Sequence, residues 1–250
     1  MNLFTRTFTT SLLRACLVAL ALHPLHAPAG DAPSADDVLK RLRKGNQRFV
    51  SEESEHRGID ESRRQETSNN GQHPVATVLT CSDSRVPPEI LFDQGIGDLF
   101  VIRVAGNVCD VDEMGSIEYA VEHLHTPLVV VLGHRGCGAV TAVVDGAELH
   151  GNLHALVDNI FPAVARTRKN YPDLKGEALI EKAINANVTQ SIKDLLKGSA
   201  IVHGHVKNGM VKIAAAMYDL KSGKVEWVNI YAQTAQASNG QGTHKEKLKK

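Results

Sequence analysis

Residues 127–138 read PLVVVLGHRGCG, and this stretch decides the fold. Residues 127–132 are apolar throughout, and polar side chains begin only at His134. Successive side chains of a strand point to opposite faces of its sheet, so an uninterrupted apolar run predicts a strand that is covered on both faces. We therefore expect a buried parallel strand over residues 127–132, with helices packed on both sides of its sheet.

The sequence on either side alternates between strand and helix patterns. Short apolar or β-branched runs predict further strands over residues 75–80, 99–104, 201–206, 214–220 and 225–230. Helically spaced apolar residues predict helices over residues 38–49, 61–67, 114–124, 153–164 and 178–196. Ser34, followed by Asp37, is the expected cap of the first helix. This order predicts an α/β fold with a mostly parallel sheet flanked by helices, and an antiparallel edge near the C-terminus.

The composition excludes several classes of protein. The chain has 250 residues, of which 42% are hydrophobic and 22% charged, so it can build a sizeable core. Lys and Arg number 28, as do Asp and Glu, so no basic excess indicates nucleic-acid binding. No apolar run reaches the roughly 20 residues of a membrane span. We expect neither a nucleic-acid partner nor a membrane span.

The first 29 residues have the pattern of a secretory signal peptide. They contain Arg6 and Arg14 but no acidic residue, an apolar run at 15–22, and the small-residue sequence Ala27-Pro28-Ala29. We expect export to the periplasm, a single domain over residues 30–232, and a disordered tail over residues 233–250. Cleavage after residue 29 leaves three cysteines, so at least one thiol stays outside any internal disulfide.

Candidate chemistry follows two of the expected strands. Cys81-Ser82-Asp83-Ser84-Arg85 comes after the strand at 75–80, and His134 and Cys137 come after the strand at 127–132. Ligands of open α/β sheets collect at the carboxyl ends of strands. Two thiolates and one imidazole suit tetrahedral Zn²⁺, and three protein ligands leave a fourth position for water. The alternative is that these cysteines are only small apolar core residues.

These motifs together resemble the β-class carbonic anhydrases. Residues 100–107 (FVIRVAGN) and 115–120 (GSIEYA) belong to the same resemblance, which spans about residues 35–228. It implies an α/β fold with a mainly parallel sheet and an extended N-terminal helix. It also implies one Zn²⁺ per subunit, bound by Cys81, His134 and Cys137, in a homodimer or a dimer of dimers.

The resemblance implies roles for further residues. Zinc lowers the pKa of bound water to about 7, which supplies hydroxide to attack CO₂. Asp83 is expected to accept the hydrogen bond of that hydroxide, and Arg85 to hold Asp83 ionised and oriented. Gln72 is expected to donate to an oxygen of CO₂ or bicarbonate. The implied substrate-binding positions are Gln72, Phe100, Ala105, Tyr119 and Gly138.

The expected activity is the reversible hydration of CO₂ by a zinc lyase, and two alternatives remain open. A hydrolase of the same fold acting on carbon disulfide or carbonyl sulfide would have the same zinc ligands. A non-enzymatic zinc-binding protein would not need Asp83, Arg85 and Gln72.

Other candidate ligands receive simpler interpretations. His203 and His205 are expected to be structural residues on the strand at 201–206. His150 and His154 could form a second metal pair but are expected on a solvated face, and Cys109 is expected to be a bystander thiol.

Overall fold

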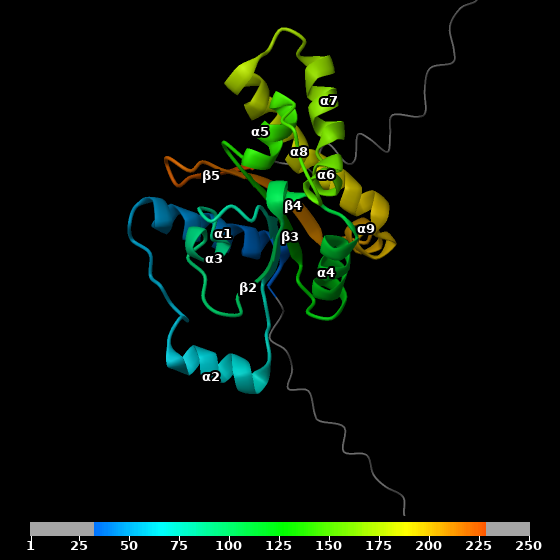
Figure 1. The fold of residues 1–250 in the computed structure, drawn as a ribbon. Helices are drawn as coiled ribbons and strands as arrows, with labels where there is room; N and C mark the ends of the chain where they lie inside the picture. The colour runs from blue at the N-terminus through cyan, green and yellow to red at the C-terminus, as the bar shows by residue number, and fades with distance from the viewer. Residues whose placement is uncertain (1–32, 229–250) are drawn as a thin grey trace, which may run out of the picture. The chain divides into compact units, whose positions relative to one another are not determined.

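Five strands form one sheet in the order β2-β1-β3-β4-β5 (Figure 1). The computed structural model describes residues 33–228, so the predicted signal peptide and tail lie outside the described residues. β1, β2, β3 and β4 pair in parallel, and β5 pairs antiparallel to β4, as the sequence predicts. The strand bounds are β1 Ala76–Thr80, β2 Leu99–Arg103, β3 Leu128–His134, β4 Lys212–Tyr218 and β5 Val225–Val228.

The helices alternate with these strands along the chain. Their bounds are α1 Ala35–Val50, α2 Glu61–Asn70, α3 Pro88–Leu91, α4 Val111–Glu122, α5 Gly138–Asp145, α6 Leu153–Asp158, α7 Phe161–Asn170, α8 Gly176–Gly198 and α9 Ala200–Lys207, with a short 3₁₀ turn, η1, at Ala105–Asn107. Most of the predicted helices are present. The exposed polar helix α2 has no buried residue and lies away from the sheet (Figure 1).

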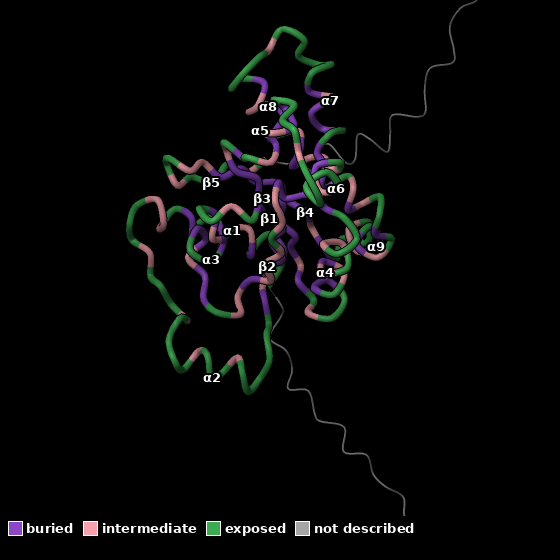
Figure 2. Tube along the Cα trace, in the orientation of Figure 1, coloured by how far each residue is buried: buried purple, intermediate pink, exposed green. Residues whose placement is uncertain are grey.

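The sheet is covered by helices on both faces. Every residue of β1 and β3 is buried, as the apolar runs predict (Figure 2). Leu79, Val129 and Val131 share one apolar cluster with side chains of α4, α5 and α8. Val78 and Val130 belong to the cluster on the opposite face, to which α1 and α3 contribute. The mostly parallel sheet is therefore held between two apolar layers.

The first helix begins where its cap predicts. The Ser34 hydroxyl oxygen accepts a hydrogen bond from the backbone N–H of Asp37 at 3.2 Å, which satisfies one of the donors that a helix start leaves free. Val38 and Leu42 lie one turn apart and are buried against the sheet. α1 is thereby fixed on the sheet by its cap and by one apolar stripe.

The predicted strand over residues 201–206 is wrong, because these residues form α9. The Ser199 hydroxyl accepts from the backbone N–H of Val202 at 3.1 Å and caps a helix there. Val202 is fully buried while Ile201 is only half-buried, in line with one helical face packing on the body of the protein. The alternation of apolar residues at 201–206 is thus overridden by the cap and by packing.

The single helix predicted over residues 153–164 is divided into α6 and α7. Pro162 lies in the first turn of α7. A proline has no N–H to donate and its ring clashes with the preceding turn, so it is tolerated at a helix start but not in the interior.

No helix within residues 33–228 is long and apolar enough to cross a membrane.

Gly45 provides a test of how closely α1 approaches Phe92, the residue that caps the end of α3. A Cβ at this position would lie 1.7 Å from the Phe92 carbonyl oxygen, so alanine would push α1 away. We predict that Gly45→Ala lowers the free energy of unfolding by about 1–3 kcal/mol, although alanine normally favours a helix. Urea denaturation followed by the fluorescence of Trp227, the only tryptophan, measures the change.

The matched control is Gly204→Ala in α9, where an added Cβ meets nothing within 4 Å. This substitution is expected to raise the free energy of unfolding by about 0.5–1 kcal/mol. Equal stabilisation by both substitutions would contradict the close approach of Gly45 to Phe92.

Candidate metal centre

The metal candidates lie where the connections leave the sheet in opposite directions. From β1 the chain passes through α3 to β2 on one side, and from β3 it passes through α5 to α9 before reaching β4 on the other. Such a point opens a crevice at the carboxyl ends of the two strands. Thr80 of β1 is paired with Leu132 of β3, so the residues that follow both strands enter this crevice together.

Three ligand atoms meet in the crevice. The Sγ atoms of Cys81 and Cys137 and a ring nitrogen of His134 all lie within 4.8 Å of one another, and the three residues are buried. Cys81 follows β1, His134 ends β3, and Cys137 is the N-cap residue of α5. The structure thus brings together the three residues that the sequence identifies as metal ligands.

The imidazole of His134 is oriented for a metal. Its Nδ1 lies 3.1 Å from the carbonyl oxygen of Arg135, an arrangement typical of a ligating histidine whose second nitrogen is held by the backbone. Its Nε2 is buried and has no hydrogen-bond partner among the described residues. A buried ring nitrogen without a partner, next to two thiols, fits Zn²⁺ in both donor type and number.

The two thiols divide one proton between them. Hydrogen bonds from Cys137 and from the N–H groups of Asp83 and Gly106, together with the neighbouring imidazole of His134, lower the pKa of Cys81 to about 4 despite its burial. The same pairing with Cys81, together with burial, raises the pKa of Cys137. One thiolate is therefore ready at neutral pH, and a bound dication would displace the second proton.

Asp83 stands beside this cluster and is paired with Arg85. The Arg85 side chain donates from Nε to Oδ1 at 2.9 Å and from Nη2 to Oδ2 at 2.7 Å, and its backbone N–H donates to Oδ1 at 3.0 Å. These bonds hold the pKa of Asp83 well below its usual range. Asp83 Oδ2 lies 3.8 Å from His134 Nε2, so the ionised carboxylate is next to the ligands without being one of them.

Arg103 supports the loop that carries Cys81 and Asp83. It donates from Nε to the Cys81 carbonyl at 3.3 Å and from Nη2 to the Asp83 carbonyl at 2.6 Å. This role is not predicted from the sequence, although Arg103 ends β2 and is paired with Thr80, the residue before Cys81. Only the register between β1 and β2 in the folded sheet places Arg103 beside the loop that begins at Cys81.

Arg135 supports the second loop, between His134 and Cys137. Its guanidinium forms ion pairs with three carboxylates that come from distant parts of the chain: Glu181, Asp219 and Glu226. Its backbone N–H donates to the Tyr218 carbonyl at 2.9 Å. Sequence patterns gave no sign of this role, because the three acids lie on three different segments.

Two of the expected substrate-binding residues lie at the metal cluster. Ala105 precedes Gly106, whose N–H donates to Cys81 Sγ at 3.3 Å. Gly138 follows Cys137 and is exposed, and a Cβ there would meet nothing within 4 Å. Small residues at these two positions leave room beside the three ligands.

The other three expected substrate-binding residues lie elsewhere in the chain. Gln72 is exposed and precedes β1, whereas Cys81 follows the opposite end of that strand. Phe100 is paired with Thr77, four residues before Cys81, which corresponds to about 13 Å along a strand. Tyr119 packs on Phe100 with ring centroids 6.0 Å apart. The roles of Gln72, Phe100 and Tyr119 stay predictions.

The remaining candidate residues do not join the cluster. His203 and His205 lie in α9, not on a strand, and His150 and His154 are both exposed. Cys109 is buried apart from the metal cluster, and burial raises its pKa to about 12. Such a thiol is unreactive at neutral pH, as expected for a bystander.

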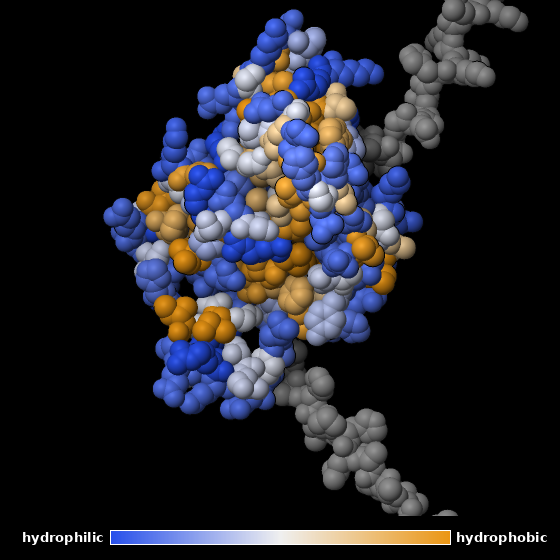
Figure 3. Space-filling model, viewed as in Figure 1, coloured by the Kyte–Doolittle hydropathy of each residue, from blue (hydrophilic) through white to orange (hydrophobic). Residues whose placement is uncertain are grey.

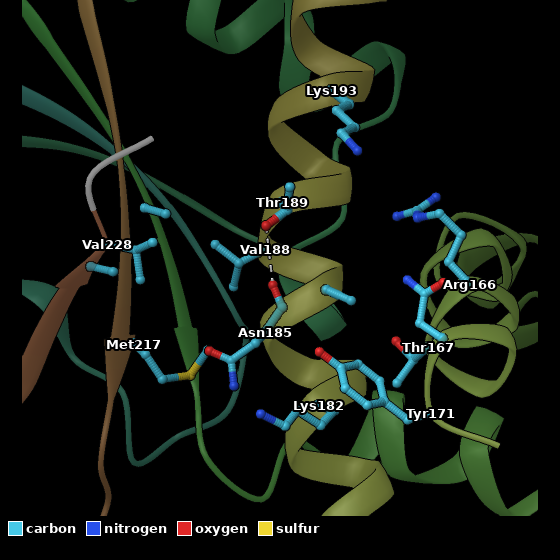
Figure 4. A pocket seen from close by; sticks show the side chains of 14 residues that line it. Arg166, Thr167, Tyr171, Lys182, Asn185, Val188, Thr189, Lys193, Met217 and Val228 are labelled. Carbon is cyan, nitrogen blue, oxygen red and sulfur yellow. Dashed lines mark hydrogen bonds between the residues drawn. The ribbon is translucent and has the colours of Figure 1, made fainter. Parts of the chain in front are cut away.

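A large cavity elsewhere in the described part of the chain has a different chemistry. It measures about 570 Å³, lies between α7, α8 and the strands β4 and β5, and is shown in Figure 4. Its lining includes Arg166, Lys182 and Lys193 but no histidine, cysteine or carboxylate. It therefore offers neither a metal site nor a carboxylate for acid–base chemistry, and the candidate functional site is the Cys81–His134–Cys137 cluster.

The fold and the cluster together define an α/β enzyme with a metal site at the carboxyl ends of parallel strands. The family profile described as carbonic anhydrase matches residues 76–225. Carbonic anhydrase 2 of Mycobacterium tuberculosis is 36% identical over 189 residues, covering 74% of this chain and 88% of the relative. The carbonic anhydrase of Mycolicibacterium smegmatis is 39% identical over 203 residues, covering 78% and 94%. The chain belongs to the carbonic anhydrase family.

Solved structures indicate the same class. The β-carbonic anhydrase CcaA superposes with a TM-score of 0.61 and 31% identity, covering 76% of this chain and 91% of that one. The β-carbonic anhydrase CafA of Aspergillus fumigatus has a TM-score of 0.63 with 23% identity, covering 83% and 100%, and shows the shared fold. The α/β fold with a mostly parallel sheet is therefore confirmed.

We predict that Cys81→Ser and Cys137→Ser each lose most of their bound zinc, because a hydroxyl is a poor substitute for a thiolate ligand. Elemental analysis of the purified variants measures the zinc content. The matched control is Cys109→Ala, which removes a buried thiol outside the cluster and is expected to retain zinc. Near-full zinc in either serine variant would reject the ligand assignment.

Proposed function

We propose that this protein catalyses the reversible hydration of CO₂ to bicarbonate and a proton, with one Zn²⁺ per chain bound by Cys81, His134 and Cys137. The observation that carries the proposal is the buried cluster of two sulfurs and one partnerless imidazole nitrogen with an ionised carboxylate beside it. The names and identities of the relatives support the same reaction.

Bound zinc would act as a Lewis acid and would lower the pKa of a water molecule bound to it to about 7. Asp83 is ionised throughout the neutral range, so it can accept a hydrogen bond from the attacking oxygen but cannot donate one. Accepting that bond directs the lone pair of the attacking oxygen toward the carbon. Arg85 fixes the plane of the carboxylate through its two parallel bonds, which a lysine could not do.

We propose a homodimer formed through the β2 edge of the sheet. β2 is an edge strand, and Phe100, Val101 and Ile102 are only half-buried, whereas β1 and β3 are fully covered. Tyr119 on the adjoining helix α4 is 47% exposed. Figure 3 shows apolar surface in this part of the molecule. A second chain would cover this area. It would bring its own Phe100 and Tyr119 towards the metal site of the first chain, which the Phe100 and Tyr119 of the first chain do not reach.

The dimer can be tested by sedimentation velocity. Phe100→Arg would place a charge in the proposed interface and is expected to give a monomer, whereas Phe161→Arg on exposed Phe161 of α7 is the matched control. A natural chain that sediments as a monomer at micromolar concentration would reject the proposal.

The identity of the substrate is tested by comparing two activity assays on the same zinc-loaded protein. Stopped-flow CO₂ hydration is expected to show turnover by the zinc-loaded protein, and a carbon disulfide assay is expected to show none. Turnover of carbon disulfide alone would favour the hydrolase. Full zinc occupancy with neither activity would favour a non-enzymatic zinc protein.

We propose that residues 1–29 direct export to a bacterial periplasm. The basic start, short apolar run and small residues at 27–29 support this. Expression of the full chain in a bacterial host, followed by cell fractionation and N-terminal sequencing, tests it. A periplasmic product beginning at residue 30 is expected, and a cytoplasmic product that retains the first 29 residues would contradict it.

Asp83→Asn separates a catalytic role of Asp83 from a structural one. We predict that the variant keeps its zinc but that CO₂ hydration falls at least about tenfold, because an amide can donate to the attacking oxygen and misdirect its lone pair. Zinc content and hydration rate are measured on the same sample. Asp173→Asn, at an exposed position, is the control.

The sign of the pH dependence follows from the low pKa of Asp83. A carboxyl group with a depressed pKa is ionised at every pH above its ordinary value. Its titration therefore cannot cause a fall of the CO₂ hydration rate between pH 8 and pH 6.

For the Asp83→Asn variant, an unchanged hydration rate with full zinc occupancy would reject the proposed catalytic role of Asp83. Loss of zinc from the variant would show that Asp83 has a structural role instead.

A further inference from the structure

Helix α8 presents two buried polar side chains to the turn beside the metal cluster. Asn187 Nδ2 donates to the Gly106 carbonyl at 2.7 Å, and the Ser191 hydroxyl donates to the Asn107 carbonyl at 2.8 Å. Both side chains are almost completely buried. Two successive carbonyl groups of η1 are therefore held by one face of α8, about 80 residues further along the chain.

The turn needs such support because its backbone is unusual. Gly106 has φ 72° and Asn107 has φ 44°, so two successive residues are in the left-handed region. Alanine at position 106 would place Cβ 2.7 Å from Ile160 Cδ1. Uncommon backbone conformations persist where the surroundings hold them in place. The bonds from α8 are what fixes the two peptide groups here.

The direction of the Gly106 N–H depends on this arrangement. The N–H donates to Cys81 Sγ at 3.3 Å, and this sulfur is a ligand of the proposed zinc site. A hydrogen bond to a thiolate withdraws charge from the sulfur and fixes its position. A continuous path of contacts thus leads from Asn187 through Gly106 to Cys81.

The hydrogen bonding of Asn187 argues against a role in core packing alone. Its Oδ1 is buried and has no hydrogen-bond partner among the described residues, so the amide leaves one polar atom unsatisfied. A buried polar atom without a partner costs stability, which an apolar side chain of similar size would avoid. What Asn187 provides and leucine would not is the donor to Gly106.

We propose that Asn187 is a positioning residue of the metal centre: it holds Gly106 by its carbonyl group, and thereby fixes the preceding peptide group, whose Gly106 N–H donates to the sulfur of Cys81. The proposal rests on the zinc site of the proposed function. Removing the donor would free the turn, weaken the N–H···S bond and release the metal faster. Ser191 acts on the same turn one peptide further on and has the smaller share.

The first experiment compares zinc release to a chelator in excess from the natural protein and from Asn187→Leu. We expect release to be about tenfold faster or more in the variant, the size typical of lost support around metal ligands. Asn185→Leu is the matched control on the same helix. Asn185 is exposed and its Nδ2 donates only to the Glu181 carbonyl of α8, so its release rate is expected to stay within about twofold.

The second experiment reads the sulfur directly. In the Co²⁺-substituted protein, loss of an N–H···S bond raises the energy of the sulfur electrons, so the thiolate-to-cobalt absorption band should move to longer wavelength in Asn187→Leu and stay unchanged in Asn185→Leu. General loosening of the fold would not shift this band in a protein whose circular dichroism is natural. Ser191→Ala removes a single hydroxyl, and we expect a smaller change in the same direction.

The outcomes separate this proposal from the proposed function. A natural chain that binds no zinc would overturn the metal site itself. If Asn187→Leu releases zinc at the wild-type rate and its cobalt absorption band keeps the wild-type wavelength, the positioning role is overturned while the zinc site stays intact. If Asn187→Leu does not fold, natural values of both measurements in Ser191→Ala would overturn it.

Discussion

The parallel pairing of β1 with β3 is the constraint on which the rest of the structure depends. These two central strands are buried on both faces, and their register places Thr80 beside Leu132. The chain then leaves β1 and β3 in opposite directions, which opens the sheet only at their carboxyl ends. Cys81 and His134 enter this opening because of register alone, although 53 positions separate them in the sequence.

The site needs a rigid surround because its own groups would repel or disperse. Three thiol and imidazole ligands are buried together, and a carboxylate lies 3.8 Å from the imidazole. Arg85, Arg103 and Arg135 each fasten a different part: the carboxylate, the loop after β1 and the loop after β3. Each arginine uses several donors at once, which fixes orientation as well as charge. These contacts hold the carboxylate and the two loops that carry the candidate ligands in fixed positions.

Helix α8 links the interior of the protein to this centre. One side of the helix contributes Val188 and Ile192 to the apolar cluster that packs on the sheet. Asn187 and Ser191 on the same helix reach the turn beside Cys81. The packing of α8 on the sheet therefore also determines where the turn beside Cys81 lies. Strand β2, by contrast, is only half-buried at the edge of the sheet, and this is the surface through which we propose that two chains pair.

The sequence by itself determined the α/β class, the central strands and the three candidate metal ligands, because these depend on local periodicity and on residues that immediately follow buried runs. It failed at residues 201–206, where the Ser199 cap and the packing of Val202 override an alternating pattern, and at Pro162, which divides one expected helix. Only the tertiary structure decided that Gln72 and Phe100 lie away from Cys81, and that Arg103, Arg135 and Asn187 support the site. Those relations depend on strand register and on contacts between distant segments, and neither is written in the spacing of residues along one chain.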